Sequence, residues 1–276
     1  VLHAHFTDLS YVIVSLKQKI NVPLVITEHS SAIIQPKLNK KVFETAKKAY
    51  GSADAVVAVS PSLVKVIEDM FEIKSRYLPN IVDVKTFDYE PIKKTKDGVF
   101  RFISVGNLKF SKRMDLIIEA FHNVFSDTPN MTLTIFGEGK ERCKIEKLIK
   151  QYDLEGKVKL MGMQPRSVIA EELKSSDCFV LPSRFETFGV VYAEALSTGL
   201  PVIATKCGGP ECFVHEENGW LIPVDDKDAL GYAMRCMYEN KKMFDRKRIS
   251  EEIKAKFSPE SVAKELIKVF KEVIKP

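Results

Sequence analysis

The sequence predicts an α/β protein with parallel sheets, built from two Rossmann-like, doubly wound domains. Short β-branched runs alternate with amphipathic helical stretches along nearly the whole chain, a polar segment interrupts this alternation once, and the alternation then restarts. Strands that alternate with helices in this way form parallel sheets. The chain has 276 residues, of which 45% are hydrophobic, and is therefore long enough to fill two cores.

The first half contains about three predicted strands, one of them at its very beginning. Strand-like residues 23–27 precede a helical stretch at 39–50, a strand at 55–59 and a helix at 63–70. An ordinary sheet has about 5–6 strands, so we expect this domain to be incomplete and its opening βα units to be missing. Because the first residues also lack an initiator Met and the pattern of a signal peptide, we expect the chain to begin inside a longer protein.

The second half predicts a complete doubly wound unit. Its strands are expected at residues 100–105, 131–136, 158–160, 178–181, 202–204 and 220–222. Its helices are expected at residues 112–125, 140–152, 166–174, 189–197 and 227–239, and a Lys-rich amphipathic helix at 259–274 closes the chain. A polar segment near residues 90–98 marks the boundary, giving domains at 1–95 and 96–258 and a terminal helix at 259–276.

Composition excludes several classes of protein. The net charge of +5 is far from the polybasic signature of a nucleic-acid-binding protein. The five cysteines are scattered without a CxxC pair and the histidines do not cluster, so we expect neither a disulfide framework nor a metal site. The longest apolar window, residues 187–205, contains Glu194, two glycines and Pro201, which favours a buried helix-turn-strand over a membrane span. We therefore expect a cytoplasmic protein.

Two carboxylates lie at a fixed spacing after the strand at 178–181. Glu186 lies in the turn before the helix at 189–197, and Glu194 is the sole charge within residues 187–205. Burying a lone carboxylate without partners is costly, so Glu194 needs a specific partner. Helix geometry separates the two carboxylates by roughly 12 Å at most, a span that fits a sugar at one end and a ribose at the other. The alternative is structural: Glu186 caps the helix and Glu194 pairs with a buried lysine.

Two segments are predicted to bind phosphate. Amides at a helix start attract anions, and here they belong to Thr187, Phe188, Gly189 and Val190. Lys112 and Arg113 follow the glycine turn at the end of the strand at 100–105, where they could neutralise a diphosphate leaving group. The alternative is that both are solvated cations at a helix start.

Further polar groups and glycines lie at strand ends. Gly137, and the pair Gly208 and Gly209, lie in turns where a missing Cβ lets backbone amides approach a ligand, although such glycines usually only make a turn. His3, His5 and His29 also lie at strand ends, where a structural role is the commoner one for a histidine. Asp226 and Asp228 resemble a metal-binding pair, but their position before a helix predicts an amino-terminal cap.

Taken together, these segments resemble the retaining GT-B glycosyltransferases of glycosyltransferase family 4. The resemblance covers nearly the whole chain from His3. Its central motif is a Glu, seven residues, Glu pattern, filled by Glu186 and Glu194. The supporting motifs, in the order of the family, are Val59-Ser-Pro, Pro79-Asn-Ile-Val-Asp, Phe136-Gly-Glu-Gly, Cys207-Gly-Gly-Pro-Glu and Asn218-Gly-Trp-Leu-Ile-Pro.

The resemblance implies a GT-B fold, in which two Rossmann-like domains face a cleft, and a role for individual residues. Glu186 would contact donor sugar hydroxyls, Glu194 the ribose and Lys112 the diphosphate, while amides at Phe188 and Gly189 would hold phosphates. His5 matches the histidine that faces the transferred sugar. Asn107 stands where the family usually has the diphosphate arginine, which leaves charge neutralisation to Lys112, aided by Arg113.

Another residue departs from the pattern of the family: Arg113 stands where the family commonly has Gly. The terminal helix is expected to cross back to the first domain, as in similar enzymes.

The resemblance also implies a mechanism. The family retains anomeric configuration without a metal or cofactor, through an oxocarbenium-like transition state in which the departing phosphate helps deprotonate the acceptor.

The implied partners are a nucleotide-sugar donor, with UDP- and GDP-sugars equally open, and a glycan or lipid-linked acceptor. The base would be held by backbone groups near residues 163–168. Basic stretches at residues 37–41 and 47–48 allow a peripheral contact with an anionic membrane, although solvated helix faces are the simpler explanation of them. Two alternatives stay open: a fragment that binds nucleotide sugar without transferring it, and a GT-B epimerase or phosphorylase.

Overall fold

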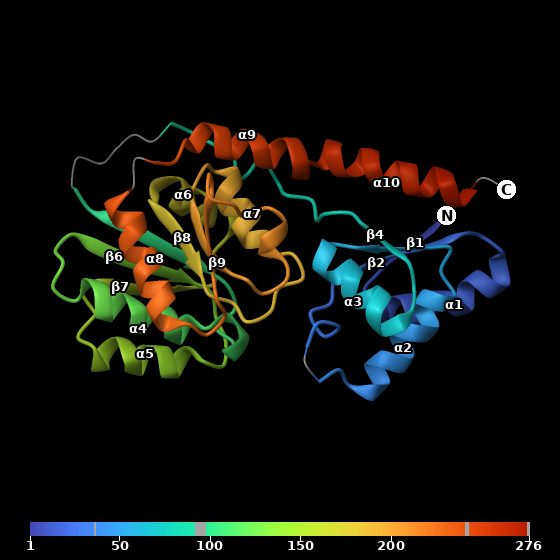
Figure 1. The fold of residues 1–276 in the computed structure, drawn as a ribbon, viewed down its shortest axis with the longest axis horizontal. Coiled ribbons are helices and arrows are strands. Elements are labelled where there is room, and N and C mark those ends of the chain that lie inside the picture. The colour runs from blue at the N-terminus through green and yellow to red at the C-terminus, as the bar shows by residue number, and fades with distance from the viewer. Residues whose placement is uncertain (36, 92–97, 241–242, 275–276) are drawn as a thin grey trace. The chain divides into compact units, whose positions relative to one another are not determined.

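The structure is a computed structural model that describes residues 1–35, 37–91, 98–240 and 243–274 (Figure 1). The chain forms two compact units. The first comprises Val1–Ile81, Phe185–Phe188 and Lys256–Pro276, and the second comprises Val82–Arg184 and Gly189–Ala255. Most of the polar segment that predicted the domain boundary, residues 92–97, lies outside the described residues.

The first unit is built on a parallel sheet of four strands in the order β1-β2-β3-β4. These strands are β1 Leu2–His5, β2 Leu24–Glu28, β3 Ala55–Ala58 and β4 Ser75–Tyr77. The sequence indicated only about three strands in this half. The structure corrects this number because β4 has only three residues, two of them exposed, and so gives no apolar strand signal.

Helices cover both faces of this sheet. In Figure 1, α1 Thr7–Ile20, α2 Lys40–Gly51 and α3 Pro61–Phe71 lie on one face, as expected when every crossover between parallel strands has the same hand. On the other face, Val262 and Val269 of α10 Pro259–Ile274 form a hydrophobic core with three residues of the sheet side. These are Val25 of β2, Val57 of β3 and Leu78, the residue after β4. Helix α1 was not predicted, because the consecutive apolar residues 12–14 favour a strand.

The second unit is built on a parallel sheet of six strands in the order β10-β9-β8-β5-β6-β7. These strands are β5 Phe100–Val105, β6 Met131–Phe136, β7 Val158–Gly162, β8 Cys178–Leu181, β9 Val202–Thr205 and β10 Gly219–Ile222. Each lies within two residues of its predicted position, which confirms the sequence assignment. The chain builds outward from β5 to β7 and then restarts at β8 on the other side of β5, which is the strand order of a Rossmann-like sheet.

The helices of the second unit also match the prediction, with two exceptions. They are α4 Met114–Phe125, α5 Arg142–Gln151, α6 Arg166–Ser175, α7 Val190–Ser197, α8 Lys227–Glu239 and α9 Arg246–Phe257. The first exception is α9, which was not predicted and extends two residues past this unit. The helix expected from Lys112 is interrupted: residues Phe110–Lys112 form a 3-10 turn, and Arg113 has a φ of 51°. Helix α4 packs against α5 and α8, and α6 lies beside α7. In the parts of the chain that the structure describes, no helix has both the length and the apolar character to cross a membrane.

Candidate functional site

The site of the second unit lies at the carboxyl ends of β5 and β8, the neighbouring strands at which the order of the sheet reverses. The loop after β5 carries Asn107 and Lys112, and the loop after β8 leads through Arg184 toward α7. These loops are joined, because the Arg184 amide donates to the Ser111 carbonyl at 2.8 Å. Ligands of open α/β sheets bind at this reversal point, so the predicted phosphate ligands lie where the fold favours a ligand.

The glycine turn after β6 supports the turn after β5. Gly137 has a φ of 134°, and a Cβ at this position would lie 2.0 Å from the Gly106 carbonyl oxygen. Its amide donates to the Gly162 carbonyl at 2.8 Å. Gly139 is similarly close to the next turn, since its Cβ would lie 2.3 Å from the Leu108 carbonyl oxygen. Backbone packing therefore accounts for these glycines, and a ligand role for Gly137 remains a prediction.

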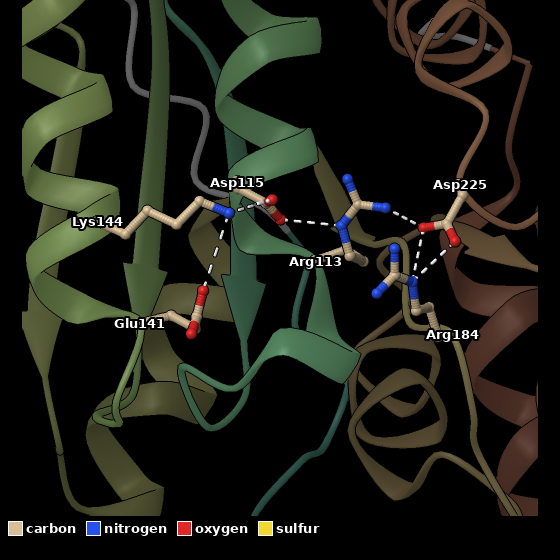
Figure 2. Close-up of polar contacts among 6 residues, drawn as sticks. All are labelled: Arg113, Asp115, Glu141, Lys144, Arg184 and Asp225. Carbon is tan, nitrogen blue, oxygen red and sulfur yellow. Dashed lines mark hydrogen bonds and ion pairs between the residues drawn. The ribbon is translucent and has the colours of Figure 1, made fainter. Parts of the chain in front are cut away.

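Arg113 is held in a network of charges (Figure 2). Its Nε lies 3.0 Å from Asp115 Oδ1, and its Nη1 is paired with Asp225. Asp225 also accepts from Arg184 Nε, at 2.9 and 2.7 Å to its two oxygens, while Lys144 Nζ lies 2.8 Å from the second oxygen of Asp115. The network connects the turn that carries Arg113 with α5 and with the loops after β8 and β10.

The conformation of Arg113 fits a position where glycine is common. A φ of 51° is left-handed, a region that costs most side chains roughly 1–2 kcal/mol. Burial lowers the pKa of the guanidinium, but hydrogen bonding to Asp115 and the charges of Asp115 and Asp225 raise it above its ordinary value. The ion pairs thus hold Arg113 as a structural cation, and a contact with a diphosphate would require them to open.

Glu194 is the buried carboxylate of α7, and its partner is an arginine. Only 4% of Glu194 is exposed, and its Oε1 lies 2.7 Å from Nη2 of Arg166, the first residue of α6. The guanidinium of Arg166 lies 4.9 Å from the ring centroid of Phe87. The structure therefore contradicts the alternative that Glu194 pairs with a buried lysine. The spacing of apolar residues could not identify Arg166, because the ion pair between Arg166 and Glu194 depends on how α6 packs beside α7.

The surroundings of Glu194 perturb its ionisation. Burial raises the pKa of Glu194, the hydrogen bond and charge of Arg166 lower it, and the charge of Asp83 raises it, with a net rise. Within α7 the only other ionisable side chain is Tyr192, whose hydroxyl donates to the Leu181 carbonyl at 2.7 Å. Arg166 is therefore the group that favours the ionised form of Glu194.

The start of α7 is the place where the sequence predicts an anion site. The helix begins at Val190, one residue later than expected, and Gly189 precedes it with a φ of 86°. A Cβ on Gly189 would lie 2.6 Å from the Tyr192 ring, so this position requires glycine. Backbone amides at such a helix start are suited to bind a phosphate. The phosphate contact itself remains a prediction.

The segment Phe185–Phe188 groups with the first unit. Thr187 donates its hydroxyl to the His29 carbonyl at 2.9 Å, and the fully buried Phe188 packs edge-on against Phe257 with ring centroids 5.2 Å apart. Glu186, which lies beside Thr187 in this segment, is 9% exposed. Glu186, the residue predicted to bind the donor sugar, therefore lies on a segment that is held in place by the contacts of Thr187 and Phe188.

The rings of His3, His5 and His29 lie together at β1 and at the end of β2. His5 Nδ1 lies 2.9 Å from His29 Nε2, and His3 Nε2 lies 2.8 Å from the Thr27 hydroxyl. Burial, followed by the charge of His5, lowers the pKa of both His3 and His29 to about 4. His29 is therefore neutral at pH 7, and its hydrogen bond orients the exposed ring of His5. The sequence placed His29 at a strand end but did not reveal this pairing.

The remaining predicted residues lie around β9 and β10. The Gly208 amide donates to both carboxylate oxygens of Glu211 at 2.9 Å, and Gly209 precedes the 3-10 turn Pro210–Cys212. Asp226 accepts from the Ala229 amide at 2.8 Å, which confirms the predicted cap of α8. Across the described ranges, no group of three or more potential metal ligands is gathered in one place.

Comparison with known protein families gives two adjoining matches. The model described as "Glycosyl transferases group 1" matches residues 86–256, and the model described as "Glycosyltransferase Family 4" matches residues 1–86. The first match covers the whole site of the second unit apart from Asp83. The second covers β1, which carries His5, and β2, which His29 follows.

Individual relatives agree with these matches. The chain is 32% identical over 179 residues to an uncharacterized glycosyltransferase of Methanocaldococcus jannaschii, covering 61% of this chain and 44% of the relative. It is 29% identical over 248 residues to the N-acetyl-alpha-D-glucosaminyl L-malate synthase of Bacillus anthracis, covering 83% of this chain and 63% of the relative. The chain thus spans about half to two thirds of the length of these two relatives.

Solved structures with the same fold include the following two. Sucrose-phosphate synthase from Thermosynechococcus elongatus has a TM-score of 0.88 at 22% identity, covering 98% of this chain and 73% of that one. HepE from Anabaena, crystallised with UDP, has a TM-score of 0.86 at 19% identity, covering 98% and 79%. These likenesses confirm the predicted GT-B fold of Rossmann-like domains.

Proposed function

Because the chain belongs to the glycosyl transferases group 1 family, we propose that it transfers a sugar from a nucleotide-sugar donor to a hydroxyl group of a glycan or lipid-linked acceptor. The observation that carries this proposal is the buried Glu194, held in an ion pair with Arg166 on a helix that follows β8. A carboxylate costs free energy when it is buried. An ionised carboxylate in this place is suited to accept hydrogen bonds from the hydroxyl groups of a ribose.

The donor phosphates are assigned to the loops at the reversal point of the sheet. Lys112 supplies a positive charge there, while Arg113 holds the turn through its pairs with Asp115 and Asp225. The amides at the start of α7, at Gly189 and Val190, add hydrogen-bond donors for phosphate oxygens. Neutralising the diphosphate stabilises it as the leaving group.

The sugar is assigned to Glu186 and His5, with Glu186 binding sugar hydroxyls. The hydrogen bond from His29 orients His5, which supports a fixed role for this ring. In the proposed reaction, the bond between the anomeric carbon and the phosphate oxygen breaks, and the acceptor oxygen bonds to the same face of that carbon. The acceptor proton passes to the departing phosphate, so that configuration is retained and neither glutamate forms a covalent bond.

The test is a calorimetric titration of the chain with UDP, GDP and ADP in the absence of metal. Solved neighbours were crystallised with UDP, so UDP is the first nucleotide to test. We expect one nucleotide to bind, and Glu194→Ala to weaken its binding on the order of 100-fold, the upper range for a hydrogen bond to a charged group. The control is Glu155→Ala, which removes an exposed carboxylate in a turn of the same unit. A folded chain that binds none of the three nucleotides would contradict the proposal.

We further propose that the acceptor belongs to a cell-surface polysaccharide or glycolipid and that the protein contacts a membrane peripherally. The support is the basic stretch at residues 37–41 and the pair at 47–48. Co-sedimentation with vesicles of anionic and of neutral lipid tests the contact. Binding to anionic vesicles that salt abolishes is expected, and equal recovery with both vesicle types would contradict it.

A further inference from the structure

We propose that Arg166 is a positioning residue for the nucleotide, which holds the Glu194 carboxylate in place and presents its second oxygen to the ribose. This inference rests on the proposed function, because it assigns a role within the same donor site. It concerns a side chain that sequence patterns did not single out. Its basis is the geometry of one ion pair and of the groups that surround it.

The two members of the pair differ in their environment. The side chain of Glu194 is 5% exposed, whereas that of Arg166 is 59% exposed. The ammonium of a lysine or a water molecule could also stabilise a carboxylate, but a guanidinium fixes its direction through a planar set of N–H donors. The Arg166 guanidinium is itself held against the Phe87 ring at 4.9 Å. Since Phe87 is only 1% exposed, the arginine rests on a fixed surface.

The contact leaves acceptor capacity on the carboxylate. A carboxylate has two oxygens with about four lone-pair sites in total, and Arg166 Nη2 approaches Oε1 at 2.7 Å. Oε2 of the same group is therefore the natural acceptor for a ribose hydroxyl. Arg166 does not have to leave when nucleotide binds. Its function is to keep Glu194 ionised, because a protonated carboxyl group loses one acceptor and gains a donor.

The charges that face Glu194 act in opposite directions. Arg166, from α6, lowers its pKa, and Asp83, from the segment before β5, raises it. Asp83 is in turn held by Thr86, whose amide lies 3.2 Å from Asp83 Oδ1. Strand β9, which packs against α7, contains no ionisable side chain. Removing Arg166 and removing the charge of Asp83 should therefore shift the ionisation of Glu194 in opposite senses.

The experiment measures nucleotide affinity against pH for the wild type, Arg166→Met, Arg166→Lys and Asp83→Asn, with whichever of UDP, GDP and ADP the wild type binds. Binding requires ionised Glu194, so it is present above the pKa of this group and is lost as the pH falls through it. Arg166→Met raises that pKa, so its loss of binding occurs at higher pH than in the wild type. At pH 7 we expect binding on the order of 10-fold weaker, the effect of one charged hydrogen bond.

The matched variants make the result specific. Arg166→Lys keeps the charge and should keep the wild-type midpoint of the pH profile, while Asp83→Asn should move that midpoint to lower pH. A second readout is the affinity for the corresponding 2′-deoxynucleotide: the wild type should prefer the ribonucleotide, and Arg166→Met should lose much of this preference. A role in folding alone would not move either readout.

The outcomes separate this inference from the proposed function. A wild type that binds no nucleotide overturns the proposed function. A wild type that binds nucleotide through Glu194, together with an Arg166→Met variant of unchanged affinity and pH midpoint, overturns only the role of Arg166. If Arg166→Met fails to fold, the Arg166→Lys variant provides the test. A pH profile of nucleotide binding whose midpoint lies at higher pH than in the wild type, despite the retained charge, also overturns the role of Arg166.

Discussion

The substitution Gly137→Ala tests the conclusion that backbone packing, rather than ligand contact, requires this glycine. A Cβ at Gly137 would lie 2.0 Å from the Gly106 carbonyl oxygen, whereas real Cβ contacts are essentially never closer than 3.0 Å. The turns after β5 and β6 must therefore separate by about 1 Å. The alanine must also adopt a φ of 134°, a region open mainly to glycine.

The expected loss of stability follows from these two terms. Backbone strain of this kind costs roughly 1–3 kcal/mol, and forced overlap in a packed region costs a further 1–3 kcal/mol or so. We therefore expect the free energy of unfolding of the second unit to fall by about 2–6 kcal/mol. For a unit of this size, each kcal/mol lowers Tm by roughly 2–4 °C, so the decrease in Tm is roughly 4–24 °C.

The assay is denaturant unfolding followed by the fluorescence of Trp220, the single tryptophan of the chain. Trp220 lies in β10 of the second unit, 5.9 Å from the ring of Phe244, so it reports on that unit alone. The control is Gly156→Ala, where a Cβ would meet no atom within 4 Å and should change stability by less than about 0.5 kcal/mol.

One result would refute the reasoning: a Gly137→Ala protein as stable as the Gly156→Ala control. If such a stable variant had also lost its affinity for nucleotide, the ligand role predicted from the sequence would replace the packing role. A variant that is both less stable and weaker in binding would agree with the structure, because the turn after β5 carries Asn107 and leads to Lys112.

Two further predictions concern the charge network and the histidines. Arg113 has a φ of 51°, so we compare its replacement by Gly with its replacement by Ala in urea unfolding. Both variants lose the ion pairs, but only Gly avoids the left-handed strain, so the Gly variant should be more stable by about 1 kcal/mol. Equal stability of the two variants would contradict this prediction. For His3 and His29, whose pKa is lowered from 6.5 to about 4 in the folded chain, the unfolded chain binds protons more readily. The stability of the first unit should therefore be complete above pH 6.5 and fall as the pH drops from 6.5 toward 4. Thermal unfolding followed by circular dichroism at several pH values checks this, and His29→Gln should make the pH dependence shallower; an unchanged dependence would argue against His29 as its source.

Much of the fold could be predicted because it depends on local periodicity. The strands of the second unit are buried on both faces, so each appears as a short continuous apolar run between amphipathic helices. Asp226 was identified as a helix cap from its place directly before α8. Elements without such a signal were missed: β4 is short and mostly exposed, and α1 contains consecutive β-branched residues.

The candidate site was predicted only in part, for a similar reason. Glu194 was recognised because a single charge in a long apolar window is conspicuous along the chain itself. Its partner was not, because Arg166 is 28 positions away and reaches Glu194 only when α6 packs beside α7. Nor could local pattern reveal that Arg113 pairs with Asp225, 112 positions along the chain.

The sequence by itself thus determined the parallel α/β architecture, the order of its elements and the position of the two carboxylates, since all of these follow from the spacing of apolar and polar residues. The tertiary structure alone decided which charge neutralises Glu194, which carboxylates hold Arg113 and why Gly137 cannot bear a side chain. These features depend on distances between segments that are remote in the chain. Packing sets those distances, and no local periodicity encodes them.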